Sequence, residues 1–155
     1  FCAGRPAWER AGAQLVSDVR PFEEAKLRLL NGSHSTIAYL GFLAGCAHVH
    51  DAMRLPGFQV LVAGLMQEMQ STLQPPEGVD LSAYRRDLIA RFCNPALQHR
   101  CYQIAMDGSQ KLPQRLLAGV RDNLRAGRGI EHASFGVAAW MRYVEGRDET
   151  GREIV

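Results

Sequence analysis

Residues 58–73 read FQVLVAGLMQEMQSTL, and their apolar side chains recur at spacings of three and four. This periodicity places the apolar side chains, from Phe58 to Leu73, on one face of a helix. Two breakers bound the pattern, because Pro56-Gly57 precedes it and Pro75-Pro76-Glu77-Gly78 follows it. The segment therefore predicts an amphipathic helix that buries one face in a core.

Helical patterns of this kind extend over most of the chain. The uncharged run at residues 36–47 predicts a buried helix, and Asp80 or Ser82 can cap a helix that carries Tyr84 to Phe92. Residues 14–19 are the only strand-like stretch, and strands and helices do not alternate. We therefore expect one all-α domain with a single core over residues 1–155. Further helices are expected from Pro21 onward, over residues 97–105 up to a turn at 107–109, from Pro113 to Gly127, and from about Ile130 to Gly146.

The composition excludes several classes of function. The chain carries 18 Lys and Arg against 16 Asp and Glu, a net charge of +2 that is too near balance to favour a nucleic acid partner. No apolar run reaches the roughly 18 residues of a membrane span. The four cysteines form no CxxC pair, so we expect reduced thiols in a cytoplasmic protein.

The usual phosphate-binding motifs are missing from the sequence. Gly127 and Gly129 begin a GxGxxG pattern, but His132 stands at its third glycine position and no strand-like stretch precedes it. The chain also begins with Phe1 rather than Met and ends at Val155 without a helix cap. We therefore expect a piece of a longer protein, with no cofactor-binding residues of its own.

A polar face stands out on the helix that is expected to begin at Pro21. On an ideal helix with Lys26 at 0°, Glu23 falls at about 60°, His34 at about 80° and Asn31 at about 140°. The four side chains thus share less than half of the helix circumference. Polar groups on an otherwise buried helix require partners or a function.

These four side chains can move a proton at an alcohol or carbonyl oxygen. Desolvation disfavours the charged form of a lysine, so a buried Lys26 can act as general acid or base without a metal. Asn31 and His34 can donate hydrogen bonds to the oxygen on which charge develops, and Glu23 can pass the proton to water. Because Lys26 and His34 lie about 12 Å apart along an ideal helix axis, we expect a break at Gly32 or the reach of the lysine to close the gap.

Three blocks of sequence resemble one enzyme family. They are FCAGRPAWE at residues 1–9, KLRLLNGSH at 26–34 and RFCNPALQHR at 91–100. With these blocks the chain resembles the polyol-specific long-chain dehydrogenases, the mannitol dehydrogenase family, over nearly its whole length. The resemblance implies a helical C-terminal substrate domain, similar to that of 6-phosphogluconate dehydrogenase. It also implies that no metal is used and that NAD is bound mainly by an N-terminal Rossmann domain absent from these residues.

The resemblance further implies roles for individual residues. Lys26 matches the family's catalytic lysine, the general acid/base that acts on a secondary alcohol. Asn31 and His34 match the residues that bind and polarise the reacting oxygen, and Glu23 aligns with a glutamate in a proton path to solvent. Lys111 matches a lysine that reaches the distal hydroxyls of a small sugar acid or polyol.

The sequence around Gln103 looks more like the uronate-reductase branch of the family, because the mannitol enzymes carry arginine there. This favours the interconversion of fructuronate and mannonate. A hexuronate carboxylate favours a cation, ideally a forked guanidinium, and Arg100, Lys111 and Arg115 are the candidates. His99 is either a pocket residue or a hydrogen-bonding residue at a helix end.

Other functions remain open at this point. A mannitol 2-dehydrogenase or an arabitol dehydrogenase would use the same residues, and a free-standing helical interaction module would use none of them catalytically. Under the dehydrogenase hypothesis, the 155 residues alone are expected to show no turnover and no NAD binding.

One pattern suggests a metal site, namely Cys46 and His50 at a spacing of four. On a helix these two would share a face, while His48 would point about 200° away from Cys46. Because a structural zinc site needs four ligands, we expect an ordinary helix surface here and no metal.

Overall fold

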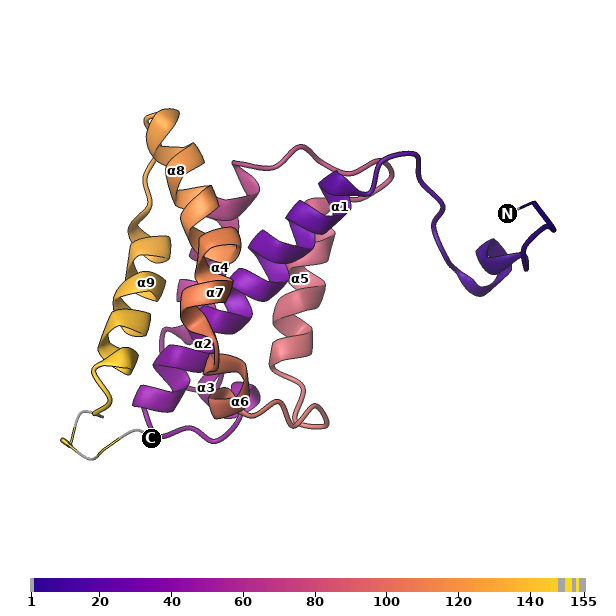
Figure 1. Cartoon of the computed structure of the whole chain (residues 1–155). Helices are drawn as coiled ribbons and strands as arrows, with labels where there is room; N and C mark the ends of the chain where they lie inside the picture. The colour runs from indigo at the N-terminus through magenta and orange to yellow at the C-terminus, as the bar shows by residue number, and fades with distance from the viewer. Residues whose placement is uncertain (1, 148–149, 152, 154–155) are drawn as a thin grey trace.

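The computed structural model describes residues 2–147, 150–151 and 153, and helices make up its core (Figure 1). Phe1, the first residue of the first family-like block, and the C-terminal Ile154 and Val155 lie outside the described residues. The described residues form helices, turns and isolated β-bridges but no strand. The prediction of an all-α fold is therefore confirmed for this part of the chain.

The helical elements follow one another closely along the chain. Elements named η are a short 3-10 helix (η1) and two π-helical segments (η2 and η3). In chain order the described elements are η1 (Trp8–Ala11), α1 (Arg20–Ala25), η2 (Lys26–Asn31), α2 (Gly32–Leu43), α3 (Val49–Ala52), α4 (Phe58–Gln70), α5 (Leu81–Phe92), α6 (Cys101–Ala105), α7 (Gly108–Leu112), η3 (Pro113–Leu117), α8 (Ala118–Arg125) and α9 (Glu131–Val144).

The centre of the bundle is one continuous helix made of α1, η2 and α2 (Figure 1). Eight of the twelve residues of α2 are buried, and α2 packs against α3, α4, α6 and α9. The break predicted at Gly32 is wrong, because this residue has an ordinary helical φ of −63°. The helix passes through Gly32 and changes its hydrogen-bonding pattern in η2 instead.

Two helices form where their sequence signals predict them. The amphipathic segment that begins at Phe58 is α4, and it turns four apolar side chains into the core. Asp80 caps α5 as expected, since its Oδ1 accepts hydrogen bonds from the N–H groups of Ser82 and Ala83 at 2.8 and 3.2 Å. An N-cap of this kind stabilises a helix by about 1 kcal/mol.

The N-terminal arm and the loop before α6 differ from the prediction. Residues 14–19 form no strand and are mostly exposed, in an arm that extends away from the bundle where no other strand is available to pair (Figure 1). The helix predicted over residues 97–105 begins only at Cys101. Asn94 starts a turn instead, because its Oδ1 accepts a hydrogen bond from the N–H of Ala96 at 2.9 Å.

Two further predicted helix boundaries differ from the structure, and nearby residues explain each difference. α2 ends at Leu43 rather than at residue 47, because Gly45 has a left-handed φ of 78° that stops the helix. Pro113 does not begin a helix but lies inside the continuous run of α7, η3 and α8. The π-helical pattern of η3 accommodates the missing N–H of the proline there.

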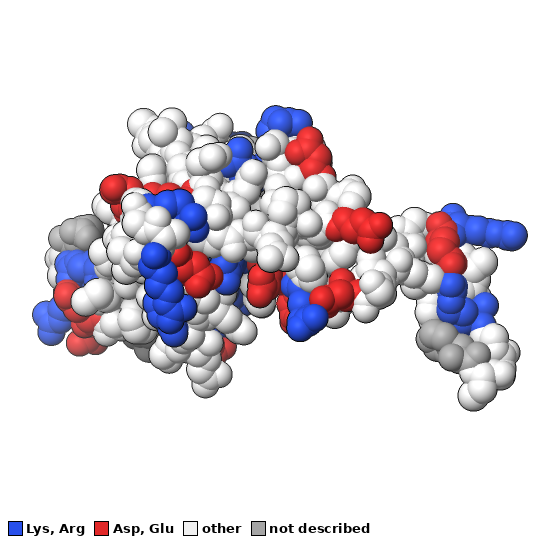
Figure 2. Space-filling view, turned by 90° about the horizontal axis from the view of Figure 1, so that it is seen from above, with Lys and Arg blue, Asp and Glu red and all other residues white. Residues whose placement is uncertain are grey.

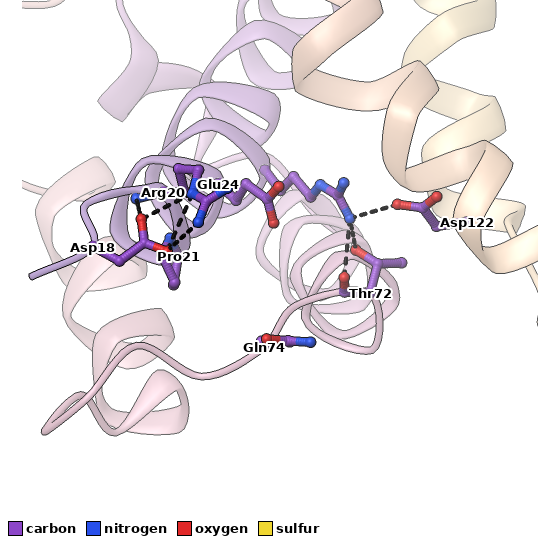
Figure 3. A pocket seen from close by; sticks show the side chains of 8 residues that line it. Asp18, Arg20, Pro21, Glu24, Thr72, Gln74 and Asp122 are labelled. Atoms are coloured by element: carbon purple, nitrogen blue, oxygen red, sulfur yellow. Dashed lines mark hydrogen bonds and ion pairs between the residues drawn. The ribbon is translucent and has the colours of Figure 1, made fainter.

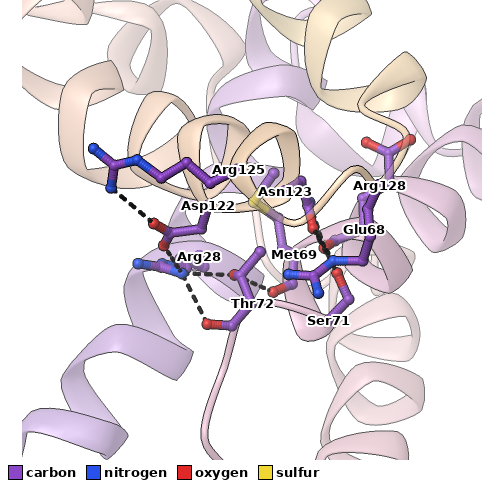
Figure 4. A network of polar contacts seen from close by, with 9 residues as sticks. All are labelled: Arg28, Glu68, Met69, Ser71, Thr72, Asp122, Asn123, Arg125 and Arg128. Carbon is purple, nitrogen blue, oxygen red and sulfur yellow. Dashed lines mark hydrogen bonds and ion pairs between the residues drawn. The ribbon is translucent and has the colours of Figure 1, made fainter.

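A buried cation connects three parts of the bundle (Figure 4). Arg28, which is only 8% exposed, donates from Nη1 to the carbonyl oxygen of Thr72 at 3.1 Å and to its Oγ1 at 2.6 Å. The same nitrogen pairs with Asp122 at 2.9 Å. The network therefore ties the central helix to the end of α4 and to α8.

Arg28→Met is expected to lower the free energy of unfolding by about 2 kcal/mol. Removing Arg28 takes a buried donor from the carbonyl and hydroxyl of Thr72, whereas the half-exposed carboxylate of Asp122 keeps Arg125 and water as partners. Arg125→Met is the matched control, because Arg125 pairs with the same carboxylate at 3.9 Å from an exposed position and should change stability by less than about 0.5 kcal/mol. Urea denaturation of both variants measures the difference, and equal effects would contradict the structural role of Arg28.

The charges on the visible face and the lengths of the described helices bear on the choice of partner. On the face seen in Figure 2, basic and acidic side chains are interspersed rather than gathered by sign. Among the described residues, no helix has the length and the apolar character that are needed to cross a bilayer.

Candidate active site

The π-helical segment η2 reduces the angle between Lys26 and Asn31 around the central helix. In a π-helix each N–H bonds to the carbonyl five residues earlier, as the N–H of Gly32 does to Leu27. Residues five apart are therefore closer to one full turn apart than in an ideal α-helix, which separates Lys26 and Asn31 by about 140°. The spacing of five residues between Lys26 and Asn31 therefore suits the π-helical hydrogen-bonding pattern of η2.

The alignment continues into α2, where the α-helical pattern returns. Ser35 follows Asn31 by four residues and Tyr39 follows Ser35 by four, so each lies one turn beyond the last. We call Lys26, Asn31, Ser35 and Tyr39 the polar stripe. Ser35 and Tyr39 are not among the predicted site residues, and the 5-4-4 spacing of the stripe is the signal that identifies them.

His34 lies beside the polar stripe, three residues after Asn31. Its ring stacks on Phe92 with 5.3 Å between ring centroids and 18° between planes, and it meets the ring of His99 edge-on, also at 5.3 Å. Of the two roles open for His99, this packing favours the pocket residue. The block at residues 91–100 therefore supplies the wall against which His34 rests.

Burial holds the imidazole of His34 in its neutral form. Desolvation is the main cause that lowers its pKa from 6.5 to about 4, and the positive charges of His99, Arg115 and Arg91 add to it. At neutral pH the ring is therefore uncharged, with one nitrogen free to donate and the other free to accept a hydrogen bond.

Two buried polar atoms at the centre of the site are unsatisfied. Asn31 Oδ1 and His34 Nε2 are shielded from solvent, yet neither makes a hydrogen bond with any described residue. Buried polar atoms without partners are rare in folded proteins, and each one requires an explanation. A polar ligand held between Asn31 and His34 would supply the missing bonds.

Lys26 and Glu23 are both exposed, so the predicted desolvation of Lys26 is wrong for the described chain. No described residue covers the ammonium group of Lys26, which is accessible to solvent. Around Lys26 the surface is nevertheless hollowed, with a cavity of about 230 Å³ whose walls include Phe22, Val79 and Tyr84. Glu23 lies one turn before Lys26 on the same helix.

A second π-helical segment, η3, packs against η2 at Gly32. The backbones approach so closely that a Cβ at Gly32 would lie 2.7 Å from the carbonyl oxygen of Arg115. The side chain of Arg115 then reaches the polar stripe, where its Nη1 donates to Ser35 Oγ at 3.0 Å. Burial lowers the pKa of this guanidinium, and its Nε has no partner among the described residues.

The structure places the other two cation candidates differently. Lys111 is turned back on its own helix end, since its Nζ donates to the carbonyl of Met106 at 2.6 Å and pairs with Asp107 at 3.6 Å. Arg100 is exposed at the N-cap of α6 and is paired through its backbone with His48. Of the three candidates, only Arg115 contacts the polar stripe.

A polar pocket of about 440 Å³ lies at the start of α1, with Asp18, Glu24 and Thr72 among its lining residues (Figure 3). Its charges are mostly satisfied within the chain. Arg20 pairs with Asp18 at 2.8 Å at its rim, and Arg28 bonds to Thr72 and Asp122. We therefore assign this pocket to the structural network and not to the candidate site.

The helical geometry assumed for Cys46 and His50 is wrong, because Cys46 lies in the loop after α2. His50 Nε2 instead contacts Asp51 at 3.2 Å, and the ring of His50 stacks on that of His48. Cys46 is free, and burial raises the pKa of its thiol. The residues thus do not share the helix face on which the metal interpretation depended.

Glu68, Glu131 and His132 are the described residues whose ligand atoms lie close enough together to hold a metal ion. The carboxylate of Glu68 is already engaged, because it accepts hydrogen bonds from the N–H groups of His132 and Ala133 at 2.8 and 2.9 Å. It also contacts His132 Nδ1 at 2.6 Å. Glu68 thus caps the N-terminus of α9, and this role explains the cluster without a metal.

The comparisons with known proteins agree with this fold. The family described as the mannitol dehydrogenase C-terminal domain matches residues 18–155. The chain therefore belongs to the mannitol dehydrogenase family, as the three resembling sequence blocks predict, and it corresponds to the C-terminal domain of that family.

Two oxidoreductase sequences and one solved structure are similar to the chain over nearly all of its length. An oxidoreductase named YdfI and the D-mannonate oxidoreductase, both from Escherichia coli strain K12, are 56% and 55% identical to it; each match covers 99% of this chain and 32% of the relative. The structure of Pseudomonas fluorescens mannitol 2-dehydrogenase in ternary complex with NAD and D-mannitol matches with a TM-score of 0.90 and 40% identity, over 98% of this chain and 31% of that one. The chain thus spans about a third of the length of these relatives.

Proposed function

We propose that the chain is the substrate-binding and catalytic helical domain of a longer NAD(H)-dependent oxidoreductase. The enzyme would interconvert a ketose or keto-uronate with the corresponding sugar alcohol or aldonate. One observation carries the proposal: Asn31 Oδ1 and His34 Nε2 are buried polar atoms without partners, on the continuous helix that also carries Lys26. Membership of the mannitol dehydrogenase family supports the same reaction class.

The residues of the chain supply the proton transfer and the polarisation of the reacting oxygen. In reduction, the charged form of Lys26 donates a proton to the oxygen of the carbonyl, and in oxidation its neutral form removes the proton from the hydroxyl. Asn31 and neutral His34 hold that oxygen by hydrogen bonds as its charge changes. Glu23, exposed one turn from Lys26, exchanges the proton with solvent.

NAD(H) supplies the hydride, and we assign its binding mainly to sequence outside these 155 residues. The described residues contain no glycine-rich turn between a strand and a helix, so they do not fit a dinucleotide site by themselves. The exposure of Lys26 also supports the assignment of NAD(H) binding to another part of the protein. We propose that another domain of the protein covers Lys26 and closes the cavity beside it.

Among possible substrates we favour a sugar acid, with fructuronate and mannonate as the pair to test first. The higher identity to the D-mannonate oxidoreductase, 55% against 40% for mannitol 2-dehydrogenases, supports this choice. Mannitol and arabitol are the neutral alternatives. We place the protein in the cytoplasm, because the four cysteines are all free.

The protein expressed from its full reading frame is expected to oxidise NADH with fructuronate, and more slowly with tagaturonate, fructose or the ketose of arabitol. Absorbance at the NADH band measures the rate. The 155 residues expressed alone should show no turnover and should not bind NADH in a fluorescence titration. Failure of the full protein to reduce any ketose or keto-uronate would overturn the proposal, and turnover by the isolated 155 residues would overturn the division of labour.

A further inference from the structure

Arg115 is a half-buried cation without an acidic partner. Its hydrogen bond to Ser35 engages Nη1, while Nε is shielded from solvent and has no partner. No carboxylate among the described residues forms an ion pair with it, in contrast to Arg28, which is paired with Asp122. Burying a charge is costly unless it is paired, so an unpaired guanidinium at a candidate ligand site favours an anionic ligand.

The position of Arg115 relative to the reacting group is fixed by two contacts. The carbonyl of Arg115 lies against Gly32, and its guanidinium is bonded to Ser35, one turn or about 5.4 Å beyond Asn31. In a six-carbon sugar acid, the carboxylate lies a few carbon–carbon bonds from the reacting carbon, a span similar to one helical turn. A substrate held at Lys26 and Asn31 would therefore bring its charged end toward Arg115.

The chemistry of the surroundings also suits a carboxylate. The hydroxyl of Tyr39, one turn beyond Ser35 on the polar stripe, is buried and makes no hydrogen bond with a described residue, so it can donate to a carboxylate oxygen. A guanidinium presents two parallel donors that match the two oxygens of a carboxylate. Lys111, four residues earlier on the same continuous helix, is already paired with Asp107.

From these observations we infer that Arg115 binds the carboxylate of a sugar-acid substrate and thereby selects the sugar acid over the neutral polyol. This inference rests on the proposed function, because it assigns a ligand to the same site. It makes Arg115 a specificity-determining residue, which holds the end of the substrate remote from Lys26.

The test compares D-mannonate with D-mannitol, which differ in a carboxylate against a hydroxymethyl group. In the protein from the full reading frame, Arg115→Gln is expected to raise the Kd for D-mannonate, measured by calorimetry, by roughly 100-fold, and to lower kcat/KM for mannonate by the same factor. The values for mannitol should change less than about threefold. Arg115→Lys keeps the charge but loses the fork, so about a tenfold loss is expected.

Arg121→Gln is the matched control, because it removes an exposed arginine from the adjoining helix α8. Equal losses for mannonate and mannitol in Arg115→Gln, or an unchanged Kd for mannonate, would overturn the inference while the proposed function stands. If instead the parent protein binds mannonate without oxidising it and Arg115→Gln weakens that binding, the inference holds and the proposed function fails. Should Arg115→Gln not fold by circular dichroism, the Arg115→Lys comparison decides in the same way.

Discussion

Lys26→Met is expected to lower turnover of the whole protein by about 10²–10⁴-fold, the usual contribution of a general acid or base. The reason is that Lys26 supplies the proton in the proposed mechanism, and the chain has only one other lysine. Lys111, the second lysine of the chain, is held at Asp107 and Met106. Steady-state rates in both directions measure the effect, and the Kd for the substrate should change little, because methionine keeps most of the side-chain volume.

Two further measurements separate a chemical role from a structural one. Arg20→Met removes an exposed cation from the same helix and should leave the rate within about twofold of the parent, since surface ion pairs contribute little. A small primary amine added to Lys26→Ala should restore part of the lost rate if the missing group is a proton donor. A near-normal rate in Lys26→Met would remove Lys26 from the mechanism.

The sequence predicts the elements whose signals are local. The apolar periodicity after Pro56-Gly57 and the cap at Asp80 require only neighbouring residues to take effect, and both α4 and α5 form as expected. The strand-like stretch at residues 14–19 forms no strand, because a strand needs a partner and alternation along one segment does not supply one. The sequence pattern therefore predicts the structure correctly where residues close together in the chain determine the element.

The geometry of the site could not be predicted from neighbouring residues either, because it involves contacts between distant parts of the chain. A wheel at 100° per residue separates Lys26 from Asn31, but the bonding becomes π-helical in η2, and a second segment, η3, packs against the adjoining Gly32. The contact between Gly32 and Arg115 joins residues more than 80 positions apart in the chain. The pattern of apolar residues around Lys26 therefore cannot predict it. The residue types at the site were predictable from chemistry, while their alignment depends on this long-range packing.

The folded chain is expected to lose about 3 kcal/mol of stability as the pH falls from 6.5 to 4, through His34 alone. In the folded state burial lowers the pKa of His34 to about 4, whereas in the unfolded chain it titrates near its ordinary 6.5. Between these values the unfolded chain binds a proton that the folded chain does not, so acid favours unfolding. Above pH 6.5 both states are neutral at His34, and this contribution is fully retained.

His34→Gln isolates that contribution, because glutamine is polar but does not titrate. Urea denaturation at pH 4.5 and 7.5 should show a smaller loss of stability in His34→Gln than in the parent, with the difference between the two set by the shift of His34 alone. Carboxylates titrate equally in both proteins, so their effects cancel in the comparison. If the parent and His34→Gln lose stability in parallel, the imidazole of His34 is hydrated in solution, and the neutral ring that polarises the substrate oxygen in the proposed mechanism is lost with it.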